Sequence, residues 1–339
     1  MSGVWKFLIG VVGGAAALVL GLAVVFVALD RQDQLKAPSF ANRLTFDEKM
    51  RQLRNRPPER VEVLFVGSST TLHGVDSEVL REQLGLDGDL LNLGVQDLRV
   101  NQIKFMADVF LDYYPTTRHV VMISTLLDYK ECGGIAETAF FEPPDVIDYV
   151  SNGWPEYYYY FRYLDLRGVL SRRNQIQHLR NADDHLESVH FSPSGSVLLD
   201  VPREAIVDRV WYGDPIELEP ACYEALRSLA QDLQAREVGF TFVLAPMRPG
   251  YLEGRDPDGS KLAQHRRLVA QALQGTGASL IDAHDALDKG EEAFFDAYHL
   301  RPDEARSLTR FIGQRMVAAR NGANHKIGLS DSLRPQPGG

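Results

Sequence analysis

The first hydrophobic pattern in the chain is an apolar stretch over residues 7–29, which contains no charged side chain. As an α-helix, a stretch of this length would span about 35 Å, which is enough to cross the hydrocarbon core of a bilayer. It is long for a cleaved signal peptide, and Val-Ala-Leu-Asp near its end is a poor cleavage site. A buried core helix is the other alternative. The length and position favour an uncleaved membrane anchor over residues 1–30, although the flanking charges barely decide its orientation.

From residue 61 onward, short apolar runs alternate with segments of helical spacing. Runs rich in Val, Leu, Ile and Phe are typical of strands that are buried on both faces of a parallel sheet. Strands are predicted at residues 61–66, 90–95, 120–125, 239–245 and 278–281. Helices are predicted from about residue 76 and over residues 100–113, 221–236, 261–273 and 302–317. This alternation predicts a three-layer α/β domain over residues 61–317, built on a five-stranded parallel sheet.

Three segments depart from this alternation. Residues 31–60 have the composition of a polar connector that holds the domain off the membrane, with a short helix over residues 46–53. Residues 130–220 are rich in Tyr, Trp, Pro and Asp and are long for a loop, so we expect an insertion after the third strand, near the carboxyl edge of the sheet. Residues 318–339 have the composition of a disordered tail.

The composition of the chain narrows the range of partners. The 339 residues carry a formal net charge of −10 and show no basic stripe or zinc-finger spacing, so nucleic acid is not an expected partner. The two cysteines, Cys132 and Cys222, are far apart and lie in no Cys-x-x-Cys pair. A disulfide framework is therefore excluded, and the alternatives are one bridge or two buried thiols.

Candidate chemistry lies at the end of the first predicted strand. Gly67 ends the apolar run, and Ser68 and Ser69 follow where the chain turns toward a helix at the carboxyl edge of the sheet. Asp296 and His299 lie three residues apart just before the last predicted helix. A histidine that is oriented by an aspartate can take the proton of a serine hydroxyl, so these residues together predict nucleophilic catalysis.

These motifs resemble those of SGNH-type hydrolases, the GDSL-like superfamily of esterases and acetyltransferases. The resemblance covers residues 61–317 apart from the insertion. It is carried by Gly-Ser-Ser at residues 67–69, by Gly94 after the second strand, and by Asp-Ala-Tyr-His at residues 296–299.

The resemblance implies a role for each matching residue. Ser69 would be the nucleophile, with Ser68 in place of the usual aspartate, and Asp296 and His299 would complete the triad. The backbone N–H groups of Gly94 and Ser69 would form the oxyanion hole.

One block departs from the family pattern. The family carries Gly-x-Asn-Asp, whose Asn donates a hydrogen bond to the oxyanion, but here Thr125 replaces the Gly and Leu127 replaces the Asn. Only Asp128 is kept. Loss of one oxyanion donor lowers the rate of such enzymes by roughly 10²–10³-fold. Another donor replaces the Asn, or the enzyme is slow, or catalysis has been lost.

A membrane helix with a Gly-Ser-Ser motif most resembles accessory proteins of cell-surface polymer acylation, such as those of alginate acetylation and teichoic-acid D-alanylation. The resemblance implies an extracytoplasmic serine esterase or O-acetyltransferase that needs no cofactor or metal. Its expected partners are the membrane, an acylated polysaccharide or other ester, and a membrane-bound O-acyltransferase. The alternative function is a catalytically weak glycan-binding or scaffold module, which Leu127 favours and the intact Ser-Asp-His set disfavours.

Each candidate residue also has an ordinary structural explanation. Ser68 and Ser69 are of a type that commonly caps turns, and His299 could lie on the surface at the sheet edge. His73 lies four residues after Ser69 and competes for the role of base. We expect it to be a loop residue, because His299 comes with its own aspartate.

Two further clusters lie within the insertion. Trp154, the aromatic run at residues 157–161, Trp211 and Tyr212 could stack on sugar rings, but a packed core of the insertion is favoured. A second cluster fits no zinc spacing and is better explained as a solvated face. Its members are His178, Asp183, Asp184, His185 and His190.

Overall fold

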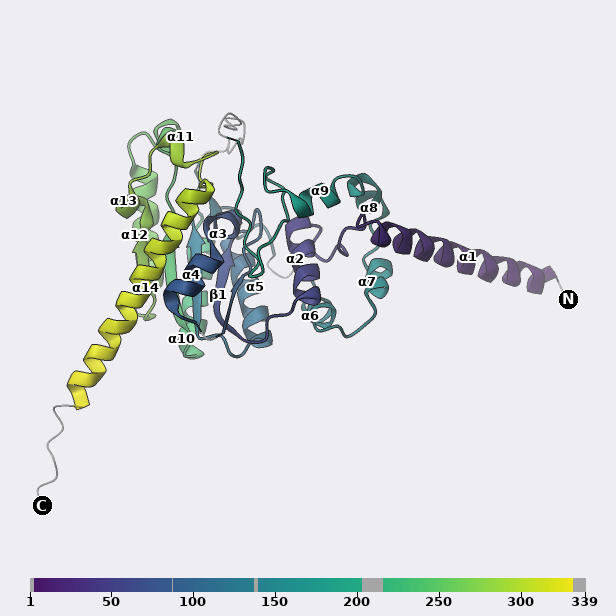
Figure 1. Ribbon diagram of the computed structural model, residues 1–339, viewed down its shortest axis with the longest axis horizontal. Helices are drawn as coiled ribbons and strands as arrows, with labels where there is room; N and C mark the ends of the chain where they lie inside the picture. Colours follow the sequence, from purple (N-terminus) through teal and green to yellow (C-terminus); the bar gives the residue numbers. More distant parts are fainter. Residues whose placement is uncertain (1–2, 87, 137–139, 203–215, 332–339) are drawn as a thin grey trace, which may run out of the picture.

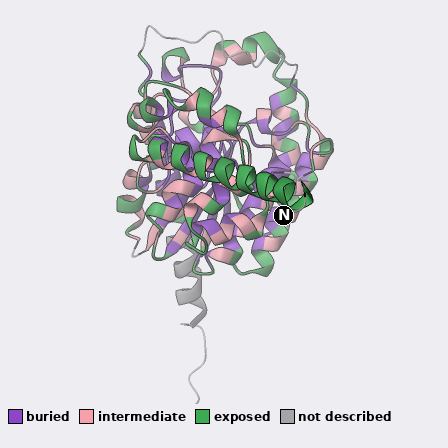
Figure 2. Cartoon of the chain, turned by 90° about the vertical axis from the view of Figure 1, so that its right-hand side faces the viewer, coloured by how far each residue is buried: buried purple, intermediate pink, exposed green. Residues whose placement is uncertain are grey.

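The computed structural model describes residues 3–86, 88–136, 140–202 and 216–331. Its globular part is an α/β domain, and the helix α1 (Gly3–Arg31) projects from one end of it (Figure 1). Seen from that end, α1 is exposed along nearly its whole length, whereas buried residues fill the centre of the domain behind it (Figure 2). α1 is long and apolar enough to cross a membrane, as the sequence predicts.

The strands form one five-stranded parallel sheet, which confirms the predicted α/β class. The strands are β1 (Val61–Gly67), β2 (Asp89–Asn92), β3 (His119–Ser124), β4 (Gly239–Leu244) and β5 (Ser279–Asp282). Their order in space is β2-β1-β3-β4-β5, and every neighbouring pair is parallel. The chain moves to opposite sides of β1 to form β2 and β3, so the strand order reverses beside β1. The carboxyl edge at such a point is where open α/β sheets bind ligands.

Alternate side chains of β1 face two different helical layers. Val63 and Phe65 pack in a core that includes residues of α4 (Ser77–Leu84) and α14 (Pro302–Asp331). Leu64 and Val66 pack in the larger core on the other face. Its helices include α5 (Val100–Tyr113), α10 (Pro220–Ala235) and α12 (Ser260–Leu273). Successive strand residues point to opposite faces, which is why the apolar run of β1 is continuous.

The connector is packed against the domain over much of its length. α2 (Leu44–Asn55) buries Phe46, Met50 and Leu53 in the larger core, where it lies against α6 (Pro143–Val150). These three residues recur at helical spacing, so α2 has an apolar face that must be covered. The segment therefore joins α1 to the domain as part of its core.

The insertion carries short helices after β3, as expected of a partly structured segment. They are α6, α7 (Glu156–Arg162), α8 (Leu166–Arg172) and α9 (Ile176–Asn181). Tyr159 and Tyr160 are buried, as the packed-core interpretation predicts, but Trp154 and Tyr158 are exposed. Trp211 and Tyr212 lie outside the described residues. The remaining elements are α3 (Ser69–Gly74), η1 (Leu126–Asp128), α11 (Pro249–Arg255), α13 (Ala283–Leu287) and η3 (Glu291–Ala293).

The structure decides between the two alternatives for the cysteines and corrects the predicted end of the last helix. Cys132 and Cys222 form a disulfide, with 5.3 Å between their Cα atoms, so the bridge is the correct alternative. α14 continues as a helix to Asp331 and not only to the expected end at residue 317. No proline interrupts the chain between Pro302 and Pro335, so nothing in the backbone stops the helix at residue 318.

Candidate active site

The turn after β1 depends on a glycine. Gly67 has a φ of +156°, and a Cβ at this position would lie 2.9 Å from the carbonyl oxygen of Ile123. The hydroxyl of Thr71 donates a hydrogen bond to that same carbonyl at 2.7 Å, which holds α3 close to the end of β3. A larger residue at position 67 would displace α3, so Gly-Ser-Ser brings two hydroxyl groups tightly against the sheet edge.

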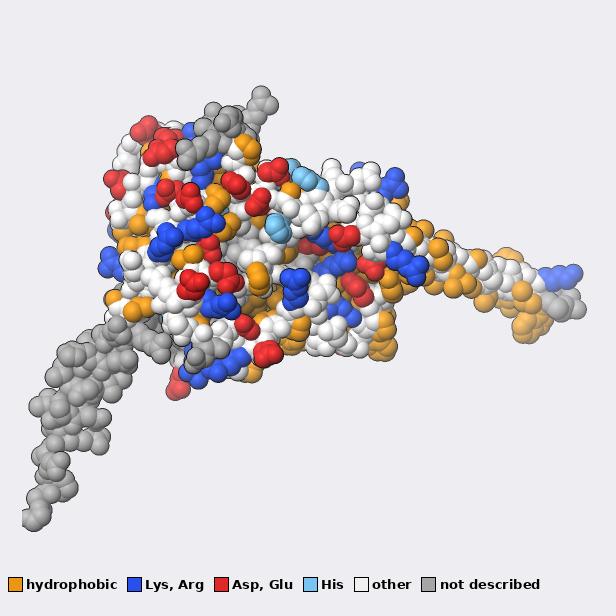
Figure 3. All heavy atoms as spheres, viewed as in Figure 1, with side chains coloured by type: hydrophobic (Ala, Val, Ile, Leu, Met, Phe, Trp, Pro, Cys, Tyr) orange, Lys and Arg blue, Asp and Glu red, His pale blue; other side chains and the backbone are white. Residues whose placement is uncertain are grey.

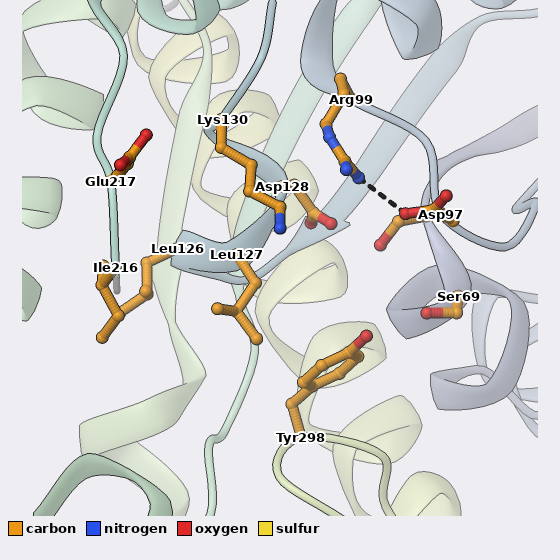
Figure 4. A pocket seen from close by; sticks show the side chains of 11 residues that line it. Ser69, Asp97, Arg99, Leu126, Leu127, Asp128, Lys130, Ile216, Glu217 and Tyr298 are labelled. Atoms are coloured by element: carbon orange, nitrogen blue, oxygen red, sulfur yellow. Dashed lines mark hydrogen bonds and ion pairs between the residues drawn. The ribbon is translucent and has the colours of Figure 1, made fainter. Parts of the chain in front are cut away.

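The two serines of this turn have different surroundings. Ser68 caps α3, since its Oγ accepts a hydrogen bond from the N–H of Thr70 at 3.4 Å, and it also bonds the carboxylate of Asp128. Ser69 lines a pocket of about 70 Å³ together with Leu127 and other side chains. Figure 4 shows the Ser69 hydroxyl directed toward this pocket. The capping explanation therefore applies to Ser68, and it leaves the Ser69 hydroxyl facing the pocket.

Asp296 and His299 form a buried pair in a tight loop. A β-bridge between Phe294 and Leu300 closes the loop. Oδ1 of Asp296 accepts hydrogen bonds from the backbone N–H groups of Tyr298 and His299, at 2.9 and 2.8 Å. Oδ2 lies 2.6 Å from Nδ1 of His299. The loop thus folds around the carboxylate and fixes the imidazole ring in one orientation.

The electrostatics of this pair determine which ring nitrogen carries the proton. Burial opposes ionisation of Asp296, but the His299 ring and the two backbone N–H groups outweigh it and lower the pKa of the carboxyl below its usual value. The ionised carboxylate accepts the Nδ1 proton, so a neutral His299 presents a lone pair on Nε2. His299 is only 4% exposed, which excludes the surface explanation, and its Nε2 has no hydrogen-bond partner among the described residues.

Ser69 begins α3, and the ring of His299 packs against the same helix. The ring of His73, on α3, is edge-on to that of His299 with 5.3 Å between centroids. His73 follows Ser69 by four residues, and residues at this spacing share one face of a helix. Tyr298, adjacent to His299, lines the same pocket as Ser69. The described residues show no hydrogen bond between Ser69 Oγ and His299 Nε2. A direct contact between Ser69 and His299 is therefore not seen, and their pairing stays a prediction.

His73 is a buried helix residue, which differs from the expected loop position. Its Nδ1 lies 2.9 Å from the carbonyl oxygen of Val197, so this nitrogen is the one that donates. Burial, helped by the neighbouring His299, lowers the pKa of His73 to about 3. His73 therefore stays neutral near pH 7 and packs behind His299, and no hydrogen bond within the described residues connects it to Ser69.

The structure uses Gly94 differently from the role that the resemblance implies. Its N–H donates to Oδ1 of Asn92 at 2.8 Å and is therefore not a free oxyanion donor here. A Cβ at this position would lie 2.4 Å from the backbone nitrogen of Leu72. Asn92 also donates to the carbonyl oxygen of Thr71 at 2.9 Å. The glycine thus lets the end of β2 approach α3 closely, and the hydrogen bond from Asn92 to Thr71 holds the two segments together.

The retained aspartate of the divergent block belongs to a polar network behind the serines. Oδ2 of Asp128 accepts hydrogen bonds from Ser124 Oγ at 2.6 Å and from the N–H of Thr125 at 3.1 Å. Burial raises the pKa of Asp128 above its usual value, although these bonds and the Ser68 hydroxyl oppose the rise. Leu127 points into the pocket where the family has its Asn (Figure 4).

Lys49 is a site-supporting residue that the sequence analysis missed. It is fully buried on α2, and its Nζ donates to the carbonyl oxygens of Asn92 and Gly94 at 2.7 and 2.6 Å. Burial holds the pKa of this amine well below its usual value. The one sign of its burial in the sequence is its position, because Lys49 lies between Phe46 and Met50 on the apolar face of α2.

Charged side chains also line the pocket. Arg99 forms ion pairs with Asp97 at 2.8 Å and with Glu131 at 2.6 Å. Lys130 extends toward the centre of the pocket in Figure 4, and Glu217 lies on the opposite wall. The lining thus combines apolar side chains such as Leu127 with charged ones.

No family model fits the sequence, and no curated protein is significantly similar to it. The chemistry of the site must therefore be inferred from its own residues.

One group of metal-ligating side chains lies close together in the described ranges. It contains Cys132, Glu219 and Cys222, and both sulfur atoms are in the disulfide, so it is not available to bind an ion as thiolates. In the His and Asp cluster of the insertion, His178 and Asp184 lie 3.7 Å apart as an exposed pair.

Proposed function

We propose that this protein is a membrane-anchored serine esterase or O-acyltransferase of the SGNH type, which acts outside the cytoplasm on an acylated cell-surface polysaccharide. The buried Asp296–His299 pair carries the proposal. Its unpartnered Nε2 lies close to the helix that begins with Ser69. The strand order β2-β1-β3-β4-β5 supports a flavodoxin-like fold, as the resemblance requires.

In the proposed reaction, Oγ of Ser69 attacks the carbonyl carbon of the ester, and its proton passes to Nε2 of His299. The ester C–O bond then breaks, and the leaving alcohol takes that proton. Water or a sugar hydroxyl next attacks the acyl-serine, again giving its proton to His299, and Ser69 is regenerated. Asp296 orients the ring and stabilises the imidazolium that forms twice in the cycle. Ser69 closes on His299 when substrate binds, because catalytic hydrogen bonds often tighten only in the complex.

The pocket supports a short acyl group. Leu126, Leu127 and Ile216 give it apolar walls, which suit the methyl group of an acetyl ester. The sugar would lie against the charged side chains of the lining. Because Gly94 N–H is engaged with Asn92, the N–H of Ser69 is the remaining oxyanion donor from the family pattern.

A scaffold function is the second candidate, and two observations favour it. The Gly94 N–H is occupied, and Leu127 offers no hydrogen bond where the family has an Asn donor. In this function the domain would hold glycan or a membrane acyltransferase without forming an acyl-serine.

Labelling with a fluorophosphonate probe separates the two functions, since only an activated serine reacts readily. We expect the wild-type protein to be labelled and Ser69→Ala to be unlabelled and inactive toward a simple acetyl ester. Ser68→Ala is the matched control, because it removes a neighbouring hydroxyl and should retain labelling. An unlabelled wild-type protein would favour the scaffold function. Labelling that is lost in Ser68→Ala would assign the nucleophile to Ser68 in place of Ser69.

A further inference from the structure

The base of α1 is clamped by helices of the insertion. Phe26 is 1% exposed, and its ring lies 5.4 Å from that of Tyr160 and 5.5 Å from that of Phe161 on α7. Val169 of α8 joins the same cluster. Arg51 of α2 pairs with Asp30 at the end of α1 at 3.1 Å. The domain is therefore firmly attached to α1, so the position of α1 sets the position of α7 and α8.

The length of α1 leaves little slack between the domain and a bilayer. The apolar part that makes no contact with the domain runs from Phe7 to Gly21, because Leu22 already packs against the cluster of Phe26 and Tyr160. As a helix it is about 22 Å long, shorter than the thickness of about 30 Å of a hydrocarbon core. If α1 spans a membrane, the hydrocarbon must therefore extend to the part of α1 that α7 and α8 contact.

Large hydrophobic side chains are exposed at this level. Leu166 and Leu170 are 38% and 53% exposed and lie one turn apart on α8, beside the buried Val169. The other three are Trp154, Tyr158 and Leu164, with exposures of 57%, 40% and 47%. In Figure 1, α7 and α8 flank the point where α1 leaves the domain, and Figure 3 shows hydrophobic side chains on that end of the molecule.

Charge at the same end is also suited to a bilayer surface. Arg167 and Arg173 are exposed at the two ends of α8. Arginines beside a hydrophobic patch match the phosphate groups of lipids, and Trp and Tyr favour the membrane–water interface. The five large hydrophobic side chains are exposed beside an apolar helix, and such a gathering is typical of a membrane-interaction surface.

We propose that α7, α8 and the residues beside them form a membrane-docking collar, consisting of Trp154, Tyr158, Leu164, Leu166 and Leu170. Its occupant is the interfacial layer of the same bilayer that holds α1. The proposal rests on α1 spanning a membrane and not on the esterase activity. The collar fixes the height and tilt of the domain above the lipid, which a single helix with a loose linker could not do.

The test uses full-length protein in vesicles of phosphatidylcholine and phosphatidylglycerol. The native cysteines are bridged, so Leu170→Cys gives one free thiol for an environment-sensitive fluorophore such as NBD. Leu280→Cys is the matched control, because Leu280 is a 46% exposed leucine on the edge strand β5. Contact with the bilayer should shift the emission of the probe at position 170 to shorter wavelength, and lipids with a nitroxide near the headgroup should quench it. The probe at position 280 should show neither effect.

Tyr158→Cys repeats the measurement on α7, in case the first variant does not fold. Equal behaviour of the probes at collar and control positions would overturn the proposal. A collar probe that is shielded from nitroxide lipids and from aqueous iodide would overturn it too, because a partner protein would then cover this face. Extraction with carbonate distinguishes the causes of failure, since protein that washes off lacks the anchor itself. Fluorophosphonate labelling of the same samples reports separately on the proposed function.

Discussion

The imidazole of His73 is edge-on to that of His299, with 5.3 Å between the ring centroids and 84° between the ring planes. Each ring uses Nδ1 to bond an oxygen, of Val197 in one case and Asp296 in the other. Two imidazolium cations at this distance would repel each other strongly, and the pKa of His73 falls to about 3 through burial and the field of His299. His73 therefore stays neutral near pH 7.

This arrangement makes the stability of the domain depend on pH. The pKa of His73 is 6.5 in the unfolded chain and about 3 in the folded protein. The contribution of His73 to stability is therefore complete above pH 6.5 and is lost as pH falls from 6.5 to 3, by up to about 4–5 kcal/mol. His73→Asn keeps an N–H for Val197 and cannot titrate. We expect its unfolding free energy in urea to vary less between pH 7 and pH 4 than that of the wild type. Parallel pH profiles would contradict the assignment.

Removal of the aspartate should reduce activity less than removal of the histidine. In Asp296→Asn, the amide oxygen can still accept the N–H groups of Tyr298 and His299, so the loop should fold. The amide nitrogen would donate to Nδ1 of His299 and place the proton on Nε2, the wrong atom for a base. We expect a loss of about 10⁴-fold in kcat on an acetyl ester, and a larger loss for His299→Ala. Steady-state kinetics on both variants provide the measurement. An Asp296→Asn variant with normal kcat would remove Asp296 from the mechanism.

The arrangement of the sheet could be predicted from local patterns because its strands are short, apolar runs separated by helices of clear spacing. β1 and α5 are both close to their predicted bounds. The pairing of Asp296 with His299 could also be anticipated, because three residues of separation allow one loop to hold both side chains. These features depend on neighbours in the sequence.

The other features of the site and the disulfide depend on contacts between segments that are distant in the sequence. Nothing beside Gly94 in the sequence indicates that Asn92 takes its N–H or that Leu72 leaves no room for a Cβ. Lys49 is recognisable as unusual only once α2 is known to be buried. The disulfide joins segments on either side of the insertion, and a sequence with two cysteines leaves their distance open.

Gly94→Ala tests the packing role of this glycine. The new Cβ would lie 2.4 Å from backbone of α3, which cannot move aside as a flexible side chain could. We expect the variant to lose about 1–3 kcal/mol of unfolding free energy, measured by urea denaturation. Gly254→Ala on α11 is the control, because its Cβ would meet nothing within 4 Å and should leave stability nearly unchanged. A Gly94→Ala protein of normal stability but low activity would restore the oxyanion role.

The disulfide gives the last prediction, because it reports on compartment as well as stability. Cys132 and Cys222 close a loop with a sequence separation of 90, and a bridge over such a loop contributes about 3–5 kcal/mol to folding. The double variant Cys132→Ala/Cys222→Ala should lose that amount in urea denaturation, while each single variant should lose a similar amount and expose one thiol. Disulfides persist outside the reducing cytoplasm, so protein trapped directly from cells should not react with maleimide–polyethylene glycol until it is reduced. Two reactive thiols in freshly trapped wild-type protein would contradict both the bridge and the extracytoplasmic location of the domain.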